Sequence, residues 1–296
     1  MEKNTSDRII RVTAAADHVR AFALSGRETV RTAKEAHHTA PVATAALGRL
    51  LCGTALMGCA LLKNEDELVT AQIEGDGPLG GLLATADCNG HVKGYVREAA
   101  VILPLREDGH LDVGRAVGRG TLRVSRDMGG AEPYSGQVEL VSGEIAEDLN
   151  YYFAASEQIP SSVGLGVLVD RDGSVLEAGG FLIQLMPGAP EEVIDRLENN
   201  IKNMKPVTEL LHDGGSPEKL LEQALNELDM RVLEEKEFSF YCNCSRERVE
   251  GALKLLGPGE LDKMIADAKG EELRCRFCNK AYRFSVEELK AIREED

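Results

Sequence analysis

Short apolar runs broken by turn residues fill the first 187 positions, and their alternation with polar residues predicts β-strands. Ser142 is placed to cap one helix, with Ile145 and Leu149 on its apolar face. The mixture indicates an α+β fold, with a sheet-and-helix core domain over residues 1–187. The predicted strands cover residues 8–13, 19–24, 68–74, 82–86, 91–96, 120–125, 137–141, 163–170 and 174–177, and a last apolar run covers 181–186.

One uninterrupted apolar run, residues 41–62, has about the 20 residues that a membrane span requires. Arg49 lies inside this run, and a central arginine costs at least about 2.5 kcal/mol in a lipid-facing helix. Glycines and threonines on every face of the run suit close packing inside a protein. We therefore predict a buried central helix and no membrane partner. The polar N-terminus has no export-signal pattern, so the expected location is the cytoplasm.

Residues 188–237 change character, because two short amphipathic helices replace the alternating pattern. Pro190 and Ser216-Pro217 mark where these helices begin, and Gly214-Gly215 separates them. The segment holds 6 basic and 13 acidic residues, which makes it far more acidic per residue than its flanks. Isolated helices of this length are marginal in water, so their apolar stripes need a surface to rest on. The segment is either an acidic linker docked on the core or a conditionally folded segment.

The last segment, residues 238–296, contains four of the seven cysteines as one C-x-C and one C-x-x-C pair. Two close pairs in one small intracellular unit are typical of tetrahedral zinc. The predicted ligands of one Zn²⁺ per chain are Cys242, Cys244, Cys275 and Cys278. Structural disulfides and unliganded thiols are the alternatives. Three helices are expected in this zinc domain, with Ser245 capping the first and a Ser285–Glu288 capping box starting the last.

Such a site can be a permanent scaffold or a redox switch. A domain of this size has an intrinsic stability of roughly 3–9 kcal/mol at typical values per residue, whereas structural zinc contributes about 10–16 kcal/mol in finger peptides. Loss of the metal should therefore unfold the domain. Zinc keeps the sulfurs as thiolates, which oxidants attack, and only one or two residues separate each cysteine from a second thiol. The spacing alone leaves scaffold and switch both open.

Other motifs carry less information. Residues 75–80 match G-x-G-x-x-G, but Pro78 removes one backbone N–H and acidic neighbours would repel phosphate, which favours a hairpin turn. Cys52 and Cys59 lie too far apart along the predicted helix for a disulfide, and with Cys88 they are predicted to be core thiols. No cluster of nucleophilic or acid–base residues is apparent, so we predict that the chain is not an enzyme.

The net charge of -16 helps to decide which kinds of partner the chain can bind. A strongly negative chain resists self-association, which suits a protein that handles aggregation-prone partners. One function to consider for a chain with a four-cysteine zinc site is that of a zinc-ribbon regulator that binds nucleic acid, and this is the main alternative to the function inferred below. Such a protein needs clustered lysine and arginine, whereas residues 238–296 carry 11 basic and 12 acidic residues. We therefore expect no nucleic-acid partner.

The residues around the cysteines resemble one known family. Residues 240–248 read F-Y-C-N-C-S-R-E-R, Leu255-Leu256-Gly257 follows, and residues 275–278 read C-R-F-C. Further stretches of likeness cover residues 75–80, 152–153, 156–160, 172–173 and 179–184. In these motifs the chain is similar to the redox-regulated heat-shock holdases, which are also called thirty-three-kilodalton chaperonins. The likeness spans nearly the whole sequence, and all four cysteines are present.

This resemblance implies an ATP-independent molecular chaperone of the oxidative and heat stress response. The reduced, zinc-bound form would be inactive. Oxidation would form Cys242–Cys244 and Cys275–Cys278 disulfides, release zinc, and unfold the zinc domain together with the linker. The apolar surface uncovered in this way would hold unfolded or partly folded client proteins, and the active form is expected to form a homodimer.

Overall fold

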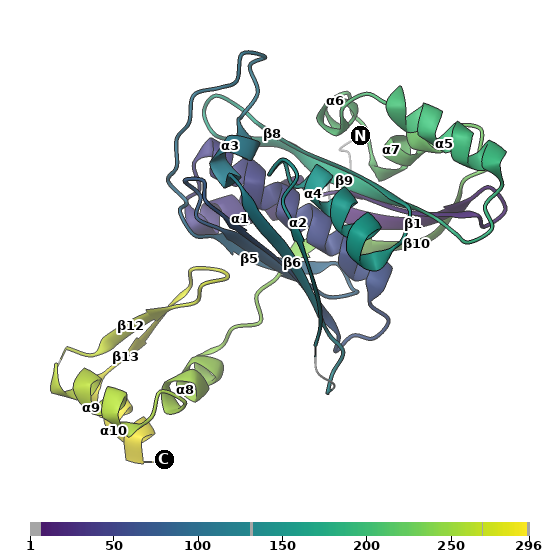
Figure 1. The fold of residues 1–296 in the computed structure, drawn as a ribbon. Coiled ribbons are helices and arrows are strands. Elements are labelled where there is room, and N and C mark those ends of the chain that lie inside the picture. Colours follow the sequence, from purple (N-terminus) through teal and green to yellow (C-terminus); the bar gives the residue numbers. More distant parts are fainter. Residues whose placement is uncertain (1–6, 131–132, 268, 295–296) are drawn as a thin grey trace, which may run out of the picture. The chain divides into compact units, whose positions relative to one another are not determined.

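The computed structural model describes residues 7–130, 133–267 and 269–294. The chain divides into two compact units, Met1–Tyr241 and Cys242–Asp296. Within the described residues three β-sheets combine with ten α-helices, and this confirms the predicted α+β class (Figure 1). The predicted three-part division, with boundaries after residues 187 and 237, stays a prediction.

Two sheets form the framework of the first unit. We call them sheet 1, with strand order β10-β1-β2-β9-β8, and sheet 2, with order β11-β5-β4-β3-β6-β7. Neighbouring strands are antiparallel except for β11 and β5, which are parallel. Sheet 1 consists of β1 (Arg8–Ala14), β2 (Val19–Ser25), β8 (Ser161–Val169), β9 (Val175–Leu185) and β10 (Arg231–Glu237). Sheet 2 consists of β3 (Leu68–Gly75), β4 (Leu82–Ala86), β5 (His91–Val96), β6 (Gly120–Asp127), β7 (Tyr134–Glu139) and β11 (Ser239–Phe240).

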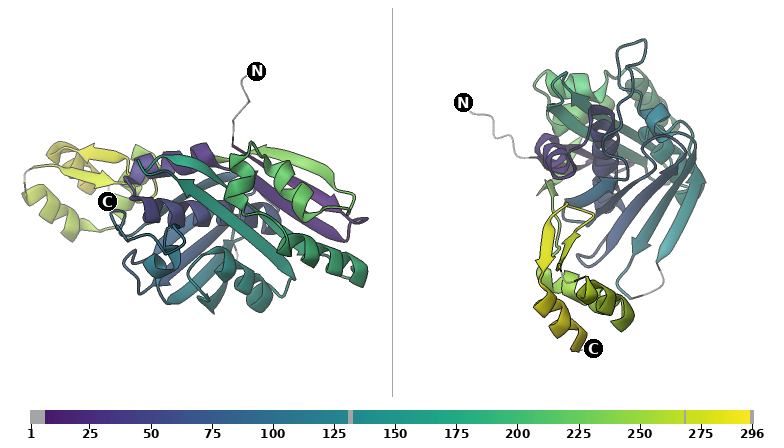
Figure 2. Two further views of the ribbon diagram at one scale, coloured as in Figure 1. Left: turned by 90° about the horizontal axis from the view of Figure 1, so that it is seen from above. Right: turned by 90° about the vertical axis from the view of Figure 1, so that its left-hand side faces the viewer.

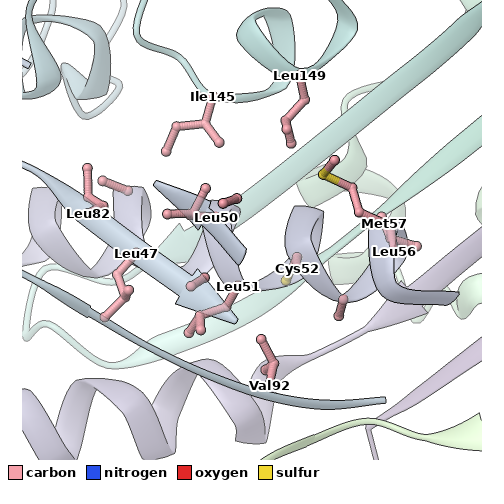
Figure 3. Packing of buried hydrophobic residues seen from close by; sticks show 14 of the residues in the cluster. Leu47, Leu50, Leu51, Cys52, Leu56, Met57, Leu82, Val92, Ile145 and Leu149 are labelled. Carbon is pink, nitrogen blue, oxygen red and sulfur yellow. The ribbon is translucent and has the colours of Figure 1, made fainter. Parts of the chain in front are cut away.

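Helix α2 (Pro41–Leu61) lies between the two sheets and contacts strands of both. Figure 3 shows its leucines and Cys52 among side chains from sheet 2 and α4. Among the described residues it is the one helix long and apolar enough to cross a membrane, and 89% of that apolar window is buried inside the protein. Arg49 points to Glu144, with 2.5 Å between Nη1 and Oε2. The prediction of a buried central helix is confirmed.

Three further helices and one π-helical turn complete the core of this unit: α1 (Arg27–His37), α3 (Val113–Val117), α4 (Ala146–Tyr152) and the turn Phe153–Glu157. The predicted cap at Ser142 is wrong, since α4 begins at Ala146. Asp148 organises this helix start instead, because its buried carboxylate accepts hydrogen bonds from four backbone N–H groups, those of Val141, Ser142, Gly143 and Ile145.

The predicted strands agree with the structure apart from three segments. The expected strand at residues 137–141 lies earlier, as β7. The expected strand at 174–177 and the apolar run at 181–186 belong to one continuous strand, β9. Two glycines in the middle of β9 permit close backbone approach, since a Cβ on Gly179 would lie 2.5 Å from the Leu24 carbonyl oxygen. The G-x-G-x-x-G run is the turn between antiparallel β3 and β4, as predicted.

The acidic segment folds as α5 (Glu191–Lys202), α6 (Val207–His212) and α7 (Pro217–Ala224), followed by β10. Helices α6 and α7 contact strands of sheet 1, and α5 contacts α7 (Figure 2). In this structure the segment is therefore docked rather than unfolded. Strand β10 was not predicted, because its residues are mostly charged and carry no apolar alternation.

The second unit contains α8 (Arg246–Lys254), α9 (Pro258–Ala266), β12 (Glu271–Arg274), β13 (Ala281–Phe284) and α10 (Val286–Glu294). The Ser245 hydroxyl accepts from the Arg248 N–H, as its predicted capping role requires. Ser285 and Glu288 form the predicted capping box, with N–H to side-chain oxygen distances of 2.8 and 3.2 Å. The buried apolar side chains of the described part of this unit are Leu253, Leu261, Tyr282, Phe284, Leu289 and Ile292.

Candidate metal centre

All four predicted ligands come together in the second unit. Their Sγ atoms lie within 4.8 Å of one another, and each cysteine is half-buried. The Sγ atoms of Cys242 and Cys275 are 3.7 Å apart, and those of Cys244 and Cys278 are 3.3 Å apart. The four sulfurs, which we call the thiol cluster, thus form one site rather than two separate pairs.

Two local structures position these sulfurs. Cys242 and Cys244 lie directly before the capped start of α8. Cys275 and Cys278 lie in the turn between β12 and β13, where the Cys275 N–H donates to the Lys280 oxygen at 3.0 Å. The Asn279 N–H donates back to the Cys275 oxygen at 2.7 Å, and Asn279 adopts the left-handed conformation that asparagine tolerates well. This turn holds the second pair of sulfurs facing the first.

The donor set fits a four-coordinate metal ion. In a tetrahedral zinc site with Zn–S bonds of about 2.3 Å, two sulfurs are about 3.8 Å apart. The Cys242–Cys275 distance of 3.7 Å is close to this value, and the Cys244–Cys278 distance of 3.3 Å is somewhat shorter. Within the described residues the group consists of cysteines alone, and soft thiolate ligands select zinc or iron–sulfur chemistry over calcium or magnesium. The cluster can therefore hold a metal ion, while the assignment of the four cysteines as zinc ligands stays a prediction.

The thiols of the cluster differ in pKa. Burial acts to raise the pKa of Cys244, but hydrogen bonds from the Tyr282 hydroxyl and the Cys278 thiol lower it to about 7. Burial raises the pKa of Cys278, and its hydrogen bond with Cys244 adds to that increase. One sulfur therefore ionises near neutral pH, and the thiolate is the form that binds metal and reacts with oxidants.

Tyr282 is a contributor that the sequence pattern did not reveal. Its hydroxyl donates to Cys244 Sγ at 3.1 Å, while its ring belongs to the small core of the second unit. The only sequence signal is an aromatic residue four positions after Cys278, which is indistinguishable from an ordinary core residue. The hydrogen bond becomes visible only when β13 places the ring beside the sulfurs.

A second feature is the apolar face of sheet 1, which the linker helices cover. We call it the covered face. On the sheet side it consists of Ile10, Val12, Ala14, Val19, Ala21, Ala23, Phe181 and Ile183. On the helix side it consists of Leu197, Val207, Leu210, Leu211, Leu220, Leu221, Ala224, Leu225 and Leu228. At its edge Arg8 forms a two-pronged ion pair with Glu218, at 2.7 and 2.8 Å. Removing the helices would expose a continuous apolar surface.

Residues 231–241, which we call the junction segment, connect the linker helices to Cys242. Strand β10 pairs with β1 at the edge of sheet 1, and β11 pairs with β5 at the edge of sheet 2. Between the two strands Phe238 is only 2% exposed, and its ring lies against Gly26. The Phe238 N–H donates to the Asp7 oxygen, and its carbonyl accepts from the Thr29 hydroxyl. The segment is thus attached to both sheets immediately before the first cysteine.

The chain is similar to known proteins over almost its full length. A family model described as Hsp33 protein matches residues 7–285. The 33 kDa chaperonin of Agathobacter rectalis is 53% identical over 288 residues, which cover 97% of this chain and 100% of that protein. The 33 kDa chaperonin of Symbiobacterium thermophilum is 47% identical over 287 residues, or 97% of each chain.

A solved structure gives the same result at the level of the fold. The 33 kDa chaperonin (Heat shock protein 33 homolog) from Thermotoga maritima superposes with a TM-score of 0.91 at 41% sequence identity, and the match covers 98% of each chain. The range matched by the family model covers most of both units and all four cysteines of the thiol cluster.

Proposed function

The chain belongs to the Hsp33 family of chaperones, and from this premise we propose that it is a redox-regulated, ATP-independent holdase. Reduced, it holds one Zn²⁺ on the thiol cluster and is inactive. Oxidised, it loses the metal, unfolds its zinc domain and linker, and binds unfolding client proteins. The observation that carries the proposal is the thiol cluster, four sulfurs within 4.8 Å in a unit with a very small apolar core.

The bound metal would supply a permanent positive charge that keeps the sulfurs ionised and the two halves of the unit together. Peroxide oxidises one thiolate to a sulfenic acid with release of water or hydroxide, and a second thiol displaces the remaining oxygen as water to form the disulfide. The sulfur positions permit more than one pairing, because all four lie within mutual reach. We assign Cys242–Cys244 and Cys275–Cys278 from the family resemblance.

The client site in this proposal is the covered face together with the apolar stripes of the linker helices. Unfolding of the second unit removes the ordered structure that follows the junction segment. Detachment of the junction segment then frees the linker helices that precede it, α5, α6 and α7. The acidic residues of the linker would keep client complexes soluble, because like-charged particles repel each other. We expect the protein to act in the cytoplasm, to form a homodimer when oxidised, and to have no enzymatic activity, membrane or nucleic-acid partner.

The direct test treats the purified, zinc-loaded protein with peroxide at mildly elevated temperature. Zinc release, followed with a chromogenic chelator, should coincide with suppression of the thermal aggregation of an unrelated protein. The reduced protein at the same temperature is the control. Unchanged aggregation after complete zinc loss would exclude the holdase function, and salt-sensitive DNA or RNA binding by the reduced form would favour the zinc-ribbon regulator.

Replacing Tyr282 with phenylalanine should weaken zinc binding without unfolding the unit. Groups that hydrogen-bond to metal ligands typically contribute about 10–100-fold in metal affinity. The hydroxyl also helps to lower the pKa of Cys244, so without it the thiolate forms at higher pH and zinc binding should shift to higher pH. Competition with a chelator between roughly pH 6 and 8 measures both effects.

Tyr241→Phe is the matched control, because this tyrosine is 54% exposed and lies outside the small core. It should leave the zinc affinity unchanged. Equal affinities and equal pH profiles for the two variants would contradict a role of the Tyr282 hydroxyl at the metal centre.

A further inference from the structure

Two thiols outside the thiol cluster lie close together in the first unit. Cys59 is near the C-terminal end of α2, and Cys88 is in the turn between β4 and β5. The Cys59 Sγ atom lies 3.9 Å from the backbone oxygen of Cys88 itself. The helix end and the turn are in direct contact, since a Cβ on Gly58 would lie 2.4 Å from the Asp87 oxygen. The Cys88 thiol itself donates to the Asn64 oxygen at 3.5 Å, so this contact must break before the two sulfurs can join.

The junction segment lies across this same turn. The Lys236 ammonium of β10 donates to the Cys88 oxygen at 3.0 Å. The Ser239 N–H donates to the Gly90 oxygen, and a Cβ on Gly90 would lie 2.2 Å from the Glu237 oxygen. Cys88 is only 9% exposed under this cover. Departure of the segment would remove the lysine and open the turn to solvent.

We propose that Cys59 and Cys88 are a second redox-active thiol pair, protected while the junction segment is docked and joined as a disulfide by peroxide once the segment has left. The inference rests on the proposed function, since oxidation of the thiol cluster is what releases the segment. Peroxide converts one thiol to a sulfenic acid and water. The other thiol then displaces the sulfenic oxygen as a second water, and the S–S bond forms.

Burial limits the reactivity of the docked pair, because Cys88 is buried and Cys59 is half-buried. It raises the pKa of Cys59 to about 12 and also raises that of Cys88, although the nearby Lys236 charge acts in the opposite direction on both. A solvent-exposed cysteine has a pKa of about 8.5, so exposure raises the thiolate fraction of both cysteines near neutral pH. A thiolate of lower pKa is also a weaker nucleophile, which offsets part of this gain. The net effect of exposure is faster reaction of both thiols.

The bond would tie the end of α2 to sheet 2 while the linker is open. In the docked state Lys236 bridges the junction segment to the turn at this place. Once the segment has left, the disulfide would link the β4–β5 turn to the end of α2, in place of the lost Lys236 contact at that turn. The core that carries the covered face would thus keep its fold while the chaperone is active.

Timed alkylation with N-ethylmaleimide and mass spectrometry of the full-length, zinc-loaded protein tests the gating. Cys52, which lies on α2 and is completely buried, is the internal standard. In the reduced wild type Cys88 should react almost as slowly as Cys52, and the half-buried Cys59 should react faster than Cys52. In Leu221→Asp, which is designed to detach the linker without oxidant, both should react at least roughly tenfold faster, while Gln223→Asp should leave them slow. Hydrogen exchange read out by mass spectrometry shows whether α7 and β10 have lost protection in Leu221→Asp. If they have, and Cys59 and Cys88 are still alkylated slowly, the proposal is wrong.

Peptide mapping without reduction tests the bond itself. After peroxide and mild heat, the wild type and Cys52→Ala should both yield a Cys59–Cys88 linked peptide, and Cys59→Ser should not. If zinc is released and aggregation is suppressed while Cys59 and Cys88 remain free thiols, the second pair does not exist although the holdase function stands. If aggregation is not suppressed, the proposed function fails, and the alkylation of Leu221→Asp still decides the gating.

Discussion

Replacing Cys242 and Cys275 together with serine should unfold the second unit in the reduced protein. The double variant keeps one thiol of each pair, so it can neither complete a four-thiolate site nor form the proposed disulfides. A unit of this size has an intrinsic stability of roughly 3–8 kcal/mol at typical values per residue. Structural zinc contributes about 10–16 kcal/mol in small domains. The metal contribution thus exceeds the whole stability of the unit, and the six buried apolar side chains among its described residues cannot compensate for the loss of the metal.

Hydrogen exchange read out by mass spectrometry checks this expectation. Protection should be lost in α8, α9 and α10 and retained in α2 and β4, which belong to the first unit. The variant should also suppress aggregation without oxidant. Cys52→Ala and Cys59→Ser remove thiols outside the cluster and should leave the protection of α8–α10 intact. Normal protection of these helices in a variant that contains no zinc would show that the metal does not maintain the fold.

Leu221→Asp should activate the chaperone while zinc is still bound. Leu221 is completely buried in the covered face, where the side chains assigned to its cluster are all apolar. An unpaired carboxylate in such a place costs several kcal/mol, because it loses its hydration without gaining a partner. Helix α7 has only eight residues and cannot stay folded by itself. The linker should therefore leave sheet 1 without any change at the thiol cluster.

Aggregation assays on the reduced variant, with the zinc content measured in parallel, give the result. Gln223→Asp is the matched control, because it adds the same charge to the exposed side of the same helix. If reduced Leu221→Asp binds client proteins and keeps its full zinc content, exposure of the covered face is sufficient for client binding without loss of the metal. Client binding by neither variant, together with proven exposure of α7, would mean that clients bind elsewhere.

Structural features that depend on residues close together in the chain were predictable from the sequence. The apolar run of α2, the alternation in most strands and the caps at Ser245 and Ser285 depend on residues within a few positions of one another. The meeting of the four cysteines was also predictable, because each pair is local and only one long-range contact has to be inferred. The same cysteine pattern, with its flanking residues, indicated the family from the sequence alone.

Other features depended on contacts between distant segments. Strand β10 is charged and half-exposed, so only pairing with β1 makes it a strand. Phe238 is a core residue because β10 and β11 carry it between the sheets, and Tyr282 donates to Cys244 because β13 sets its ring beside that sulfur. Cys59 and Cys88 read as unrelated core thiols in the sequence and meet only where α2 ends against the β4–β5 turn. The sequence thus determined most of the helices and strands and the grouping of the four cysteines, whereas the tertiary structure decided which face of sheet 1 the linker helices cover and which of the other thiols lie near each other. The reason is that backbone pairing and burial between distant segments leave no periodic signal in either segment alone.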